Sequence, residues 1–313
     1  MNFLKKASPF WVVPLLTLLI FSSCKKFSGD VTVPSFLHVD NIIVTPQAEN
    51  APSTEAGFYT SLVDAVQIIC LFDGDMAETN LGTFQLPCTV PVLRSGKPKY
   101  VTIIPCVKQN GISGTRIEYP YYQYIQLTDV TLTTGDTTFL GTYDTATDRW
   151  NLETHYYTLQ RMDILCDDYF EPTTFSTHFD STLTWVRNDP QNACSGQGYG
   201  LVHVTDSMQT LTFSIPQEFN PDPKKYLYLE MDYWTDVELQ VNMAGFITTS
   251  QQASTFSVIM LYANTHWQKI YINLGKTWSQ FNYNVPIAIA LQAVNTKGVT
   301  GDVRIDNFKI VAI

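Results

Sequence analysis

The sequence predicts an all-β protein built from antiparallel β-sandwiches. Short runs rich in Val, Ile, Thr, Tyr and Phe recur along the chain, with Gly, Asp, Asn and Pro between them. Clear examples are residues 66–70, 100–104, 226–231 and 269–274. After the N-terminal segment we find no convincing amphipathic helix, and strands without intervening helices favour antiparallel sheets. The chain has 313 residues with 45% hydrophobic content, which is sufficient for substantial cores in one to three domains.

Residues 1–23 have the features of a signal peptide. Lys5 and Lys6 precede an apolar run, residues 10–21, that is short for a membrane span and ends in two serines and Cys24. The end of this run resembles the lipobox of bacterial lipoproteins, although Phe stands where Leu is usual; the alternative is ordinary secretion with a coincidental cysteine. The resemblance implies a lipid on Cys24, a tether over residues 24–32, and a location at the outer membrane on its cell-surface side.

Charge and cysteine content exclude several classes of partner. Residues 1–23 hold two lysines and no acidic residue, so the mature chain carries a net charge of −12 instead of −10. This charge argues against binding to nucleic acid or to acidic lipid head groups. Besides Cys24, five cysteines remain, which leaves a disulfide open but at least one thiol free, and most of them are expected to be small buried residues. They are Cys70, Cys88, Cys106, Cys166 and Cys194, and no spacing among them predicts a zinc site.

The first predicted domain comprises residues 33–140. Asp73-Gly74 follows a strand and supplies a turn, and Gly96 permits the positive φ that reverses the chain before the next strand. Together with the turn at Leu86-Pro87, these features resemble the PEGA-type β module, an antiparallel sandwich. Modules of that type carry no known chemistry.

A linker is predicted over residues 141–165, where Thr, Asp and Tyr dominate and no strand pattern is strong. Residues 34–40, 110–112, 115–116 and 119–122 are similar to a family of uncharacterised Bacteroidota lipoproteins, and the similarity extends over most of the mature chain. The family has no assigned reaction, so the resemblance implies location and architecture but no catalytic residues.

The second predicted domain comprises residues 166–313. Segments 168–171, 195–200, 266–272 and 303–310 resemble carbohydrate-binding modules of the jelly-roll type. The resemblance implies a structural calcium ion held by Glu171 in the opening segment and Asp306 in the final strand, and oxygen-only ligands suit that ion. The alternative is that Asp306 and Asn307 simply turn the last strand. No other cofactor is expected.

Sugar-binding modules use exposed aromatic faces, so the tryptophans of the second domain are the candidate glycan contacts. They are Trp185, Trp234, Trp267 and Trp278. A core position is the preferred interpretation for each of them, because a Trp in a β-sandwich is usually buried.

We predict that the protein is not an enzyme. The sequence contains no nucleophile elbow, no zinc-protease motif and no phosphate-binding glycine loop. Glu230 and Asp232 lie two residues apart and therefore share one face of a strand, and Asp73 and Asp75 have the same spacing. Pairs of carboxylates of this kind are the catalytic residues of many glycosidases. A solvated face of the sheet is the preferred interpretation of these carboxylates.

Two classes of function therefore compete. A tyrosine-rich stretch with Tyr121, Tyr122 and Tyr124 favours a contact surface, and its alternative is a partly buried edge strand. The preferred hypothesis is an accessory subunit of an envelope complex for outer-membrane protein assembly, secretion or nutrient import. The alternative is a glycan-binding surface lipoprotein. We prefer the protein partner because no platform of aromatic and polar residues stands out.

Four Asp-Ser/Thr triplets resemble the O-glycosylation sequon of Bacteroidota. The acceptors would be Thr137, Thr145, Ser181 and Ser207. Composition alone produces roughly one or two such triplets, so the excess is mild.

Overall fold

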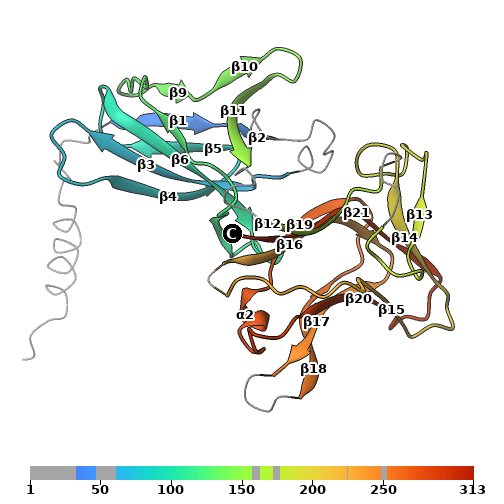
Figure 1. The fold of residues 1–313 in the computed structure, drawn as a ribbon. Helices are drawn as coiled ribbons and strands as arrows, with labels where there is room; N and C mark the ends of the chain where they lie inside the picture. The colour runs from blue at the N-terminus through green and yellow to red at the C-terminus, as the bar shows by residue number, and fades with distance from the viewer. Residues whose placement is uncertain (1–32, 47–60, 157–162, 172–176, 224, 248–251) are drawn as a thin grey trace, which may run out of the picture.

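The computed structural model describes residues 33–46, 61–156, 163–171, 177–223, 225–247 and 252–313. The predicted signal peptide, Cys24 and the tether lie outside the described residues. The regular secondary structure of the described chain is β-strand apart from one short helix, and the chain forms two domains (Figure 1). The all-β prediction is confirmed.

The first domain contains eleven strands in three small sheets. They are β1 (Ser35–Val39), β2 (Asn41–Pro46), β3 (Ala65–Phe72), β4 (Thr79–Gln85), β5 (Cys88–Val92), β6 (Pro98–Lys108), β7 (Arg116–Glu118), β8 (Ile125–Leu127), β9 (Thr137–Phe139), β10 (Thr142–Asp144) and β11 (Arg149–Tyr156). The sheets have the orders β5-β1-β9, β10-β11-β2 and β4-β3-β6-β7, with β8 also on β6. Two strand pairs, β1 with β9 and β2 with β11, are parallel, which is possible because about a hundred residues separate the partners in sequence.

The predicted turn at Asp73-Gly74 and the predicted positive φ at Gly96 are confirmed. Gly74 and Gly96 have φ values of +86° and +104°, in the region that side chains rarely adopt. Gly74 begins the connection from β3 to β4, which pair in antiparallel fashion.

The predicted linker over 141–165 is wrong for residues 142–156, which form β10 and β11. β11 pairs in parallel with β2 over six residues, so this segment belongs to the first domain. β12 (Asp163–Asp168) pairs with the last strand of the chain and belongs to the second domain. The strand pattern is weak in sequence because β10 and one face of β11 are solvent-exposed and therefore carry Thr, Asp and Glu.

The second domain is a jelly-roll-like sandwich of two antiparallel sheets. Besides β12, its elements are β13 (Thr184–Val186), β14 (Tyr199–Val204), β15 (Thr210–Ser214), β16 (Leu227–Thr235), β17 (Glu238–Phe246), β18 (Ala253–Leu261), β19 (Gln268–Asn273), α2 (Gly275–Trp278), β20 (Ala288–Val294) and β21 (Gly301–Ala312). The six-stranded sheet has the order β13-β14-β21-β16-β19 with β12 also on β21, and the four-stranded sheet has the order β15-β20-β17-β18. The core of this domain lies between the sheets.

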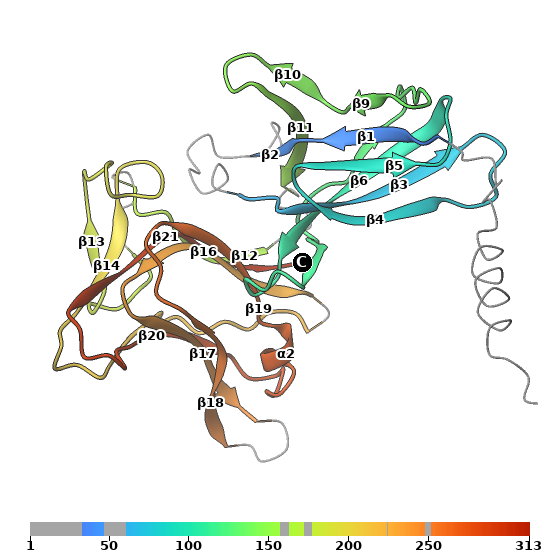
Figure 2. The same cartoon turned by 180° about the vertical axis from the view of Figure 1, so that it is seen from behind.

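The two domains share a buried interface. The apolar core of the first domain continues onto the outer face of the six-stranded sheet and includes Tyr228, Tyr271 and Val311 of the second domain. The backbone of Gln109 bridges to that of Tyr271, and Asn110 N–H donates to the carbonyl oxygen of Tyr271 at 2.8 Å. Figures 1 and 2 show β12, β16, β19 and the C-terminus at this junction.

The cysteines are free thiols in the described part of the chain. Cys70, Cys106 and Cys166 are buried, while Cys88 and Cys194 are partly buried. Burial raises the pKa of Cys70 and of Cys106 to about 11, so these thiols are unreactive at neutral pH.

Candidate functional site

The predicted tyrosine contact surface lies inside the molecule. Tyr121 and Tyr122 have no exposed surface, and only Tyr124 is half-exposed. The hydroxyl of Tyr121 donates to the carbonyl oxygen of Val311 at 3.0 Å, and the hydroxyls of Tyr122 and Tyr271 are 2.7 Å apart. The contact-surface prediction is therefore wrong for Tyr121 and Tyr122, because the second domain covers this stretch and satisfies its hydroxyl groups.

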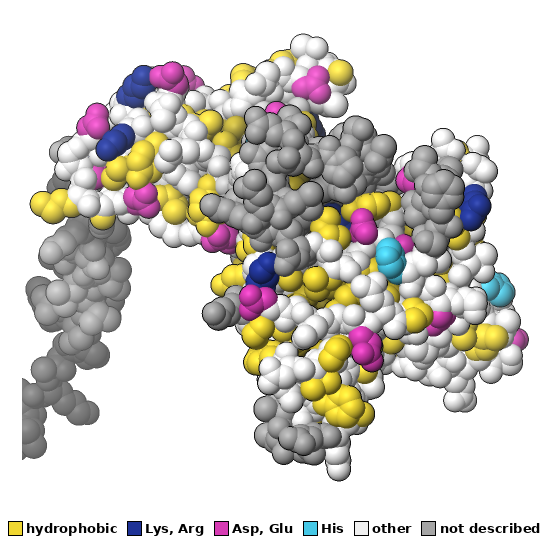
Figure 3. Space-filling model, viewed as in Figure 1, with side chains coloured by type: hydrophobic (Ala, Val, Ile, Leu, Met, Phe, Trp, Pro, Cys, Tyr) yellow, Lys and Arg dark blue, Asp and Glu magenta, His cyan; other side chains and the backbone are white. Residues whose placement is uncertain are grey.

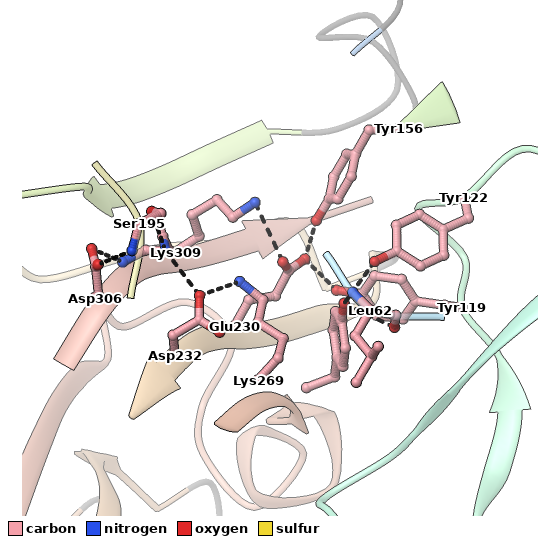
Figure 4. Close-up of polar contacts among 12 residues, drawn as sticks. Leu62, Tyr119, Tyr122, Tyr156, Ser195, Glu230, Asp232, Lys269, Asp306 and Lys309 are labelled. Atoms are coloured by element: carbon pink, nitrogen blue, oxygen red, sulfur yellow. Dashed lines mark hydrogen bonds and ion pairs between the residues drawn. The ribbon is translucent and has the colours of Figure 1, made fainter. Parts of the chain in front are cut away.

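Glu230 is buried beneath Tyr119 and Tyr156 rather than solvated (Figure 4). Tyr119 and Tyr156 both donate hydrogen bonds to its Oε1. The Nζ of Lys309 lies 3.3 Å from Oε2, and both side chains of this pair have no exposed surface. Burial acts to raise the pKa of Glu230, but the charges of Lys309 and Lys269 and the two tyrosine donors outweigh it and hold the pKa below its usual value.

Asp232 continues this polar cluster along β16. Its Oδ2 lies 3.4 Å from the Nζ of Lys269 and accepts a hydrogen bond from the Nδ2 of Asn307 at 2.9 Å. Asp232 is 2% exposed, so the expectation of a solvated face was wrong for both carboxylates. The reason is tertiary: tyrosines of the first domain cover Glu230, whereas Asp232 is paired with Lys269 and Asn307 of the second domain. Since Glu230 and Asp232 are buried and paired with lysines, they are not placed to act on a substrate.

The two predicted calcium ligands flank one loop. Asp306 is fully buried and accepts hydrogen bonds from the backbone N–H groups of Ser195 at 3.2 Å and Asn307 at 2.8 Å. Glu171 accepts from the backbone N–H of Gln197. Between them, Gly196 has a φ of +62°, and a Cβ added there would lie 1.5 Å from the Oε1 of Glu171, so a larger residue would displace this carboxylate.

The electrostatics of this loop fit a cation. Burial, followed by the charges of Asp232 and Glu171, raises the pKa of Asp306 well above its usual value. A bound divalent cation would relieve that repulsion, and carboxylates are suitable ligands for Ca²⁺. Among the described residues, however, no three His, Cys, Asp or Glu side chains gather as a metal site.

The four candidate tryptophans are not free platforms. Trp278 is 4% exposed and lies in the core. Trp185 is partly buried, donates to the carbonyl oxygen of Phe170 at 2.8 Å, and carries the guanidinium of Arg187 3.9 Å from its ring centroid.

Trp234 and Trp267 lie together on the outer side of the six-stranded sheet. Both are partly buried and meet edge to face with ring centroids 6.4 Å apart. The guanidinium of Arg304 lies 4.8 Å from the centroid of Trp234, and the indole N–H of Trp267 donates to the carbonyl oxygen of Asn192 at 3.0 Å. Arg304 therefore covers part of Trp234, and the two indole rings pack against each other.

An open groove of about 500 Å³ lies where the two domains meet. One wall is the β6–β7 turn, Asn110 to Ile112, and the other is the end of β18 with the segment that leads to β19. Tyr262 is 74% exposed and Ile112 is 55% exposed, so the groove presents an aromatic ring and an apolar side chain to solvent. No sequence pattern marked Tyr262 as a binding residue. Residues 110–112 were among those that resemble the Bacteroidota lipoproteins.

The groove walls are held by hydrogen bonds. Asn110 Oδ1 accepts from the backbone N–H of Asn273 at 2.9 Å, which fixes the turn against β19. Asn264 Oδ1 accepts from the N–H of Thr235 at 3.0 Å, and Tyr233 donates to the Oε1 of Gln268 at 3.1 Å. Amide side chains thus line an aromatic groove, which is the composition of a polar small-molecule site.

Two other hollows are lined by the second domain alone. One, of about 130 Å³, lies on the other flank of Tyr262 and includes Asp236, Glu238 and Lys297. The other, of about 750 Å³, lies beside Tyr283 and adjoins residues outside the described part of the chain.

The four O-glycosylation candidates differ in accessibility. Thr145, Ser181 and Ser207 are exposed, whereas Thr137 is partly buried in β9. Among the described residues, no helix has the length and apolar character needed to cross a membrane.

The chain matches no protein-family model and no curated protein. Solved structures with a similar fold include the family 11 carbohydrate-binding module of a cellulosomal cellulase of Clostridium thermocellum, at 12% identity and a TM-score of 0.32, covering 47% of this chain and 95% of that chain. TmCBM61, in complex with beta-1,4-galactotriose, has 14% identity and a TM-score of 0.29, covering 45% of this chain and 89% of that chain. These values describe a likeness over about half of the chain and assign no ligand to it.

Proposed function

We propose that this protein is a non-catalytic glycan-binding lipoprotein, anchored in the outer membrane through Cys24. The observation that carries the proposal is the groove at the domain junction, where the exposed ring of Tyr262 stands among amide side chains. Sugars have apolar C–H faces that pack on aromatic rings and hydroxyl groups that require hydrogen-bond partners. The similarity of the first domain to PEGA-type modules and to Bacteroidota lipoproteins belongs to this proposal.

The charge of the chain favours a neutral glycan. The mature chain carries a net charge of −12, and acidic side chains line the hollow on the other flank of Tyr262. A polyanionic sugar would be repelled by this field. Neutral glucans, mannans and galactans are therefore the appropriate probes.

Substitution of Tyr262 tests the proposal. Native gels containing each polysaccharide, followed by calorimetry, should show retention of the wild-type chain and at least about tenfold weaker binding by Tyr262→Ala. Tyr226→Ala is the matched control, because Tyr226 is 63% exposed in the same domain but does not line the groove. Binding of Tyr262→Ala equal to that of Tyr226→Ala would exclude the groove as the site.

The accessory-subunit hypothesis is the weaker candidate. Two of its three proposed contact tyrosines are buried. On the face that Figure 3 shows, outside the grey atoms, apolar side chains lie in small separate groups rather than in one broad patch. Stoichiometric recovery of one outer-membrane complex with the tagged protein, together with no glycan binding, would restore that hypothesis.

We also retain a structural calcium ion as part of the proposal. Glu171 and Asp306 would hold it through carboxylate oxygens at the loop around Gly196. Its contribution would be to neutralise buried negative charge and fix the loop, with no part in glycan recognition.

A further inference from the structure

A row of four contacting aromatic rings lies at the surface of the first domain. His38 in β1 contacts Phe139 in β9 with ring centroids 4.8 Å apart, and Phe139 stacks on Trp150 in β11 at 5.5 Å with planes 27° apart. Tyr143 in β10 completes the row, 5.5 Å from Trp150. Phe139 and Tyr143 are 45% and 44% exposed, and the other two rings are partly exposed. We call these four side chains the aromatic row.

The row joins two different sheets. β9 pairs with β1 in one sheet, while β10 and β11 pair in another. The link between β9 and β10 is tight: Gly141 has a φ of +103°, and a Cβ there would lie 2.3 Å from the carbonyl oxygen of Asn151. Only glycine fits this conformation and space, so the tight link brings Phe139 against Trp150.

Hydrogen-bonding groups border the aromatic row. His38 Nδ1 is 2.8 Å from Thr89 Oγ1, which leaves the Nε2 of the ring for another partner. The hydroxyl of Tyr143 donates to Asp148. Among the described residues, no acceptor is found for the indole N–H of Trp150. Apolar ring surface and polar groups therefore alternate along the row.

The size of the aromatic row decides between classes of partner. An aromatic side chain has about 150–250 Å² of surface, so four rings with at most 45% of it exposed offer no more than about 450 Å². A stable protein interface buries about 800 Å² on each partner. The row is one ring wide and lacks a surrounding apolar patch of that size, so it fits a few sugar rings of one extended chain.

We propose that the aromatic row is a second glycan site, which takes a segment of a neutral polysaccharide, and that long polymers engage the row and the groove together. The class of ligand in this inference rests on the proposed function, whereas the site itself consists of other residues than the groove. In both views β9 and β10 lie on the side of the first domain away from the second domain, and β11 runs from there to the domain junction (Figures 1 and 2). A chain that spans both sites would gain avidity without any new contact.

Calorimetry on the full mature chain, with neutral gluco-, manno- and galacto-hexasaccharides as probes, counts the sites. We expect about two bound oligosaccharides for the wild type and one for either Phe139→Ala or Tyr262→Ala. Phe139→Ala should also weaken binding of the parent polysaccharide by about tenfold or more. Tyr124→Ala is the matched control, because Tyr124 is 50% exposed in the same domain and lies outside the row.

The outcomes separate the two proposals. One site that is lost in Tyr262→Ala and retained in Phe139→Ala overturns the aromatic row alone. One site that is lost in Phe139→Ala and retained in Tyr262→Ala supports the row and overturns the groove. A chain that binds none of the probes overturns both.

Fluorine NMR tests the aromatic row with Phe139 in place, so the result does not depend on whether Phe139→Ala folds. The chain labelled with 5-fluorotryptophan gives a resonance for Trp150 that Trp150→Phe identifies by its loss. In the Tyr262→Ala variant, addition of the hexasaccharide that binds in calorimetry should shift the Trp150 resonance. The resonance of the core residue Trp278 should stay unchanged. No shift of the Trp150 resonance at saturating sugar contradicts the second site.

Discussion

Replacing Lys309 with Met tests whether the buried ion pair holds the two domains together. Lys309 lies on β21 of the second domain, 3.3 Å from Glu230, and the tyrosines that donate to Glu230 come from the first domain. Met has a similar length and no charge, so the change removes the cation without opening a large cavity. It leaves the Glu230 carboxylate buried beneath Tyr119 and Tyr156.

The structure sets the expected magnitude. Removing one partner of a buried ion pair costs about 3–5 kcal/mol, because the remaining charge is desolvated and unpaired. Glu230 keeps two tyrosine donors and the nearby charge of Lys269, so we expect the lower end of this range. About 3 kcal/mol corresponds to a roughly 150-fold change in the unfolding equilibrium.

Urea unfolding of the full chain, followed by Trp fluorescence at pH 7, measures this loss. The control is Lys97→Met, which breaks an exposed pair with Asp129 and should leave the free energy of unfolding nearly unchanged. The double variant Glu230→Gln with Lys309→Met removes both charges and should recover to within about 1–2 kcal/mol of the wild type. Equal free energies of unfolding for Lys309→Met and Lys97→Met would refute the reasoning.

The same variant predicts a pH dependence. In the wild type the pKa of Glu230 is depressed, so its contribution to stability is present above the unfolded value of 4.5 and is lost as the pH falls through the lower folded value. Without Lys309, burial dominates and raises the folded pKa, so acidification relieves the cost of the buried charge. The stability deficit of Lys309→Met should therefore shrink between pH 7 and pH 5, and a constant deficit would contradict this sign.

Three further predictions concern other parts of the molecule. Gly141→Ala should cost at least about 2 kcal/mol of unfolding free energy, because its φ is +103° and backbone atoms fill the Cβ position; a loss below about 0.5 kcal/mol in urea unfolding, the usual scale of surface changes, would contradict it. Millimolar Ca²⁺ should raise the melting temperature of the wild type and not of Glu171→Gln, and the increase should be greatest at pH values above the raised pKa of Asp306; equal melting curves with Ca²⁺ and chelator would exclude the ion. Cys24→Ala should move the protein from the membrane fraction to the soluble fraction after cell breakage, and its retention with outer membranes would contradict lipid anchoring.

Local sequence patterns predicted the β-strands because alternation along a strand depends on neighbouring residues only. The runs at 66–70, 100–104, 226–231 and 269–274 fall within or overlap β3, β6, β16 and β19. The same patterns failed at β10 and β11, which the sequence assigned to a linker. Those strands are solvent-exposed on one or both faces, so the hydrophobic signal that marks a strand is weak there.

Tertiary structure decided which chemically similar residues are accessible. Tyr121 and Tyr124 are three residues apart in one tyrosine-rich stretch, yet the first is buried by the second domain and the second is half-exposed. Likewise, Glu230 has the spacing of a solvated carboxylate and lies under the interface. Burial of this kind depends on the docking of another domain, which no local pattern records.

The sequence by itself determined the all-β class and the acidic charge that favours neutral ligands. It also predicted the position of the export signal. Only the tertiary structure assembled the groove around Tyr262 and the aromatic row of His38, Phe139, Tyr143 and Trp150. These residues come from strands that are far apart in the chain or belong to different sheets. Their proximity follows from long-range pairing and from the fit of two domains, because the contact of side chains is fixed by packing in space and not by their spacing in sequence.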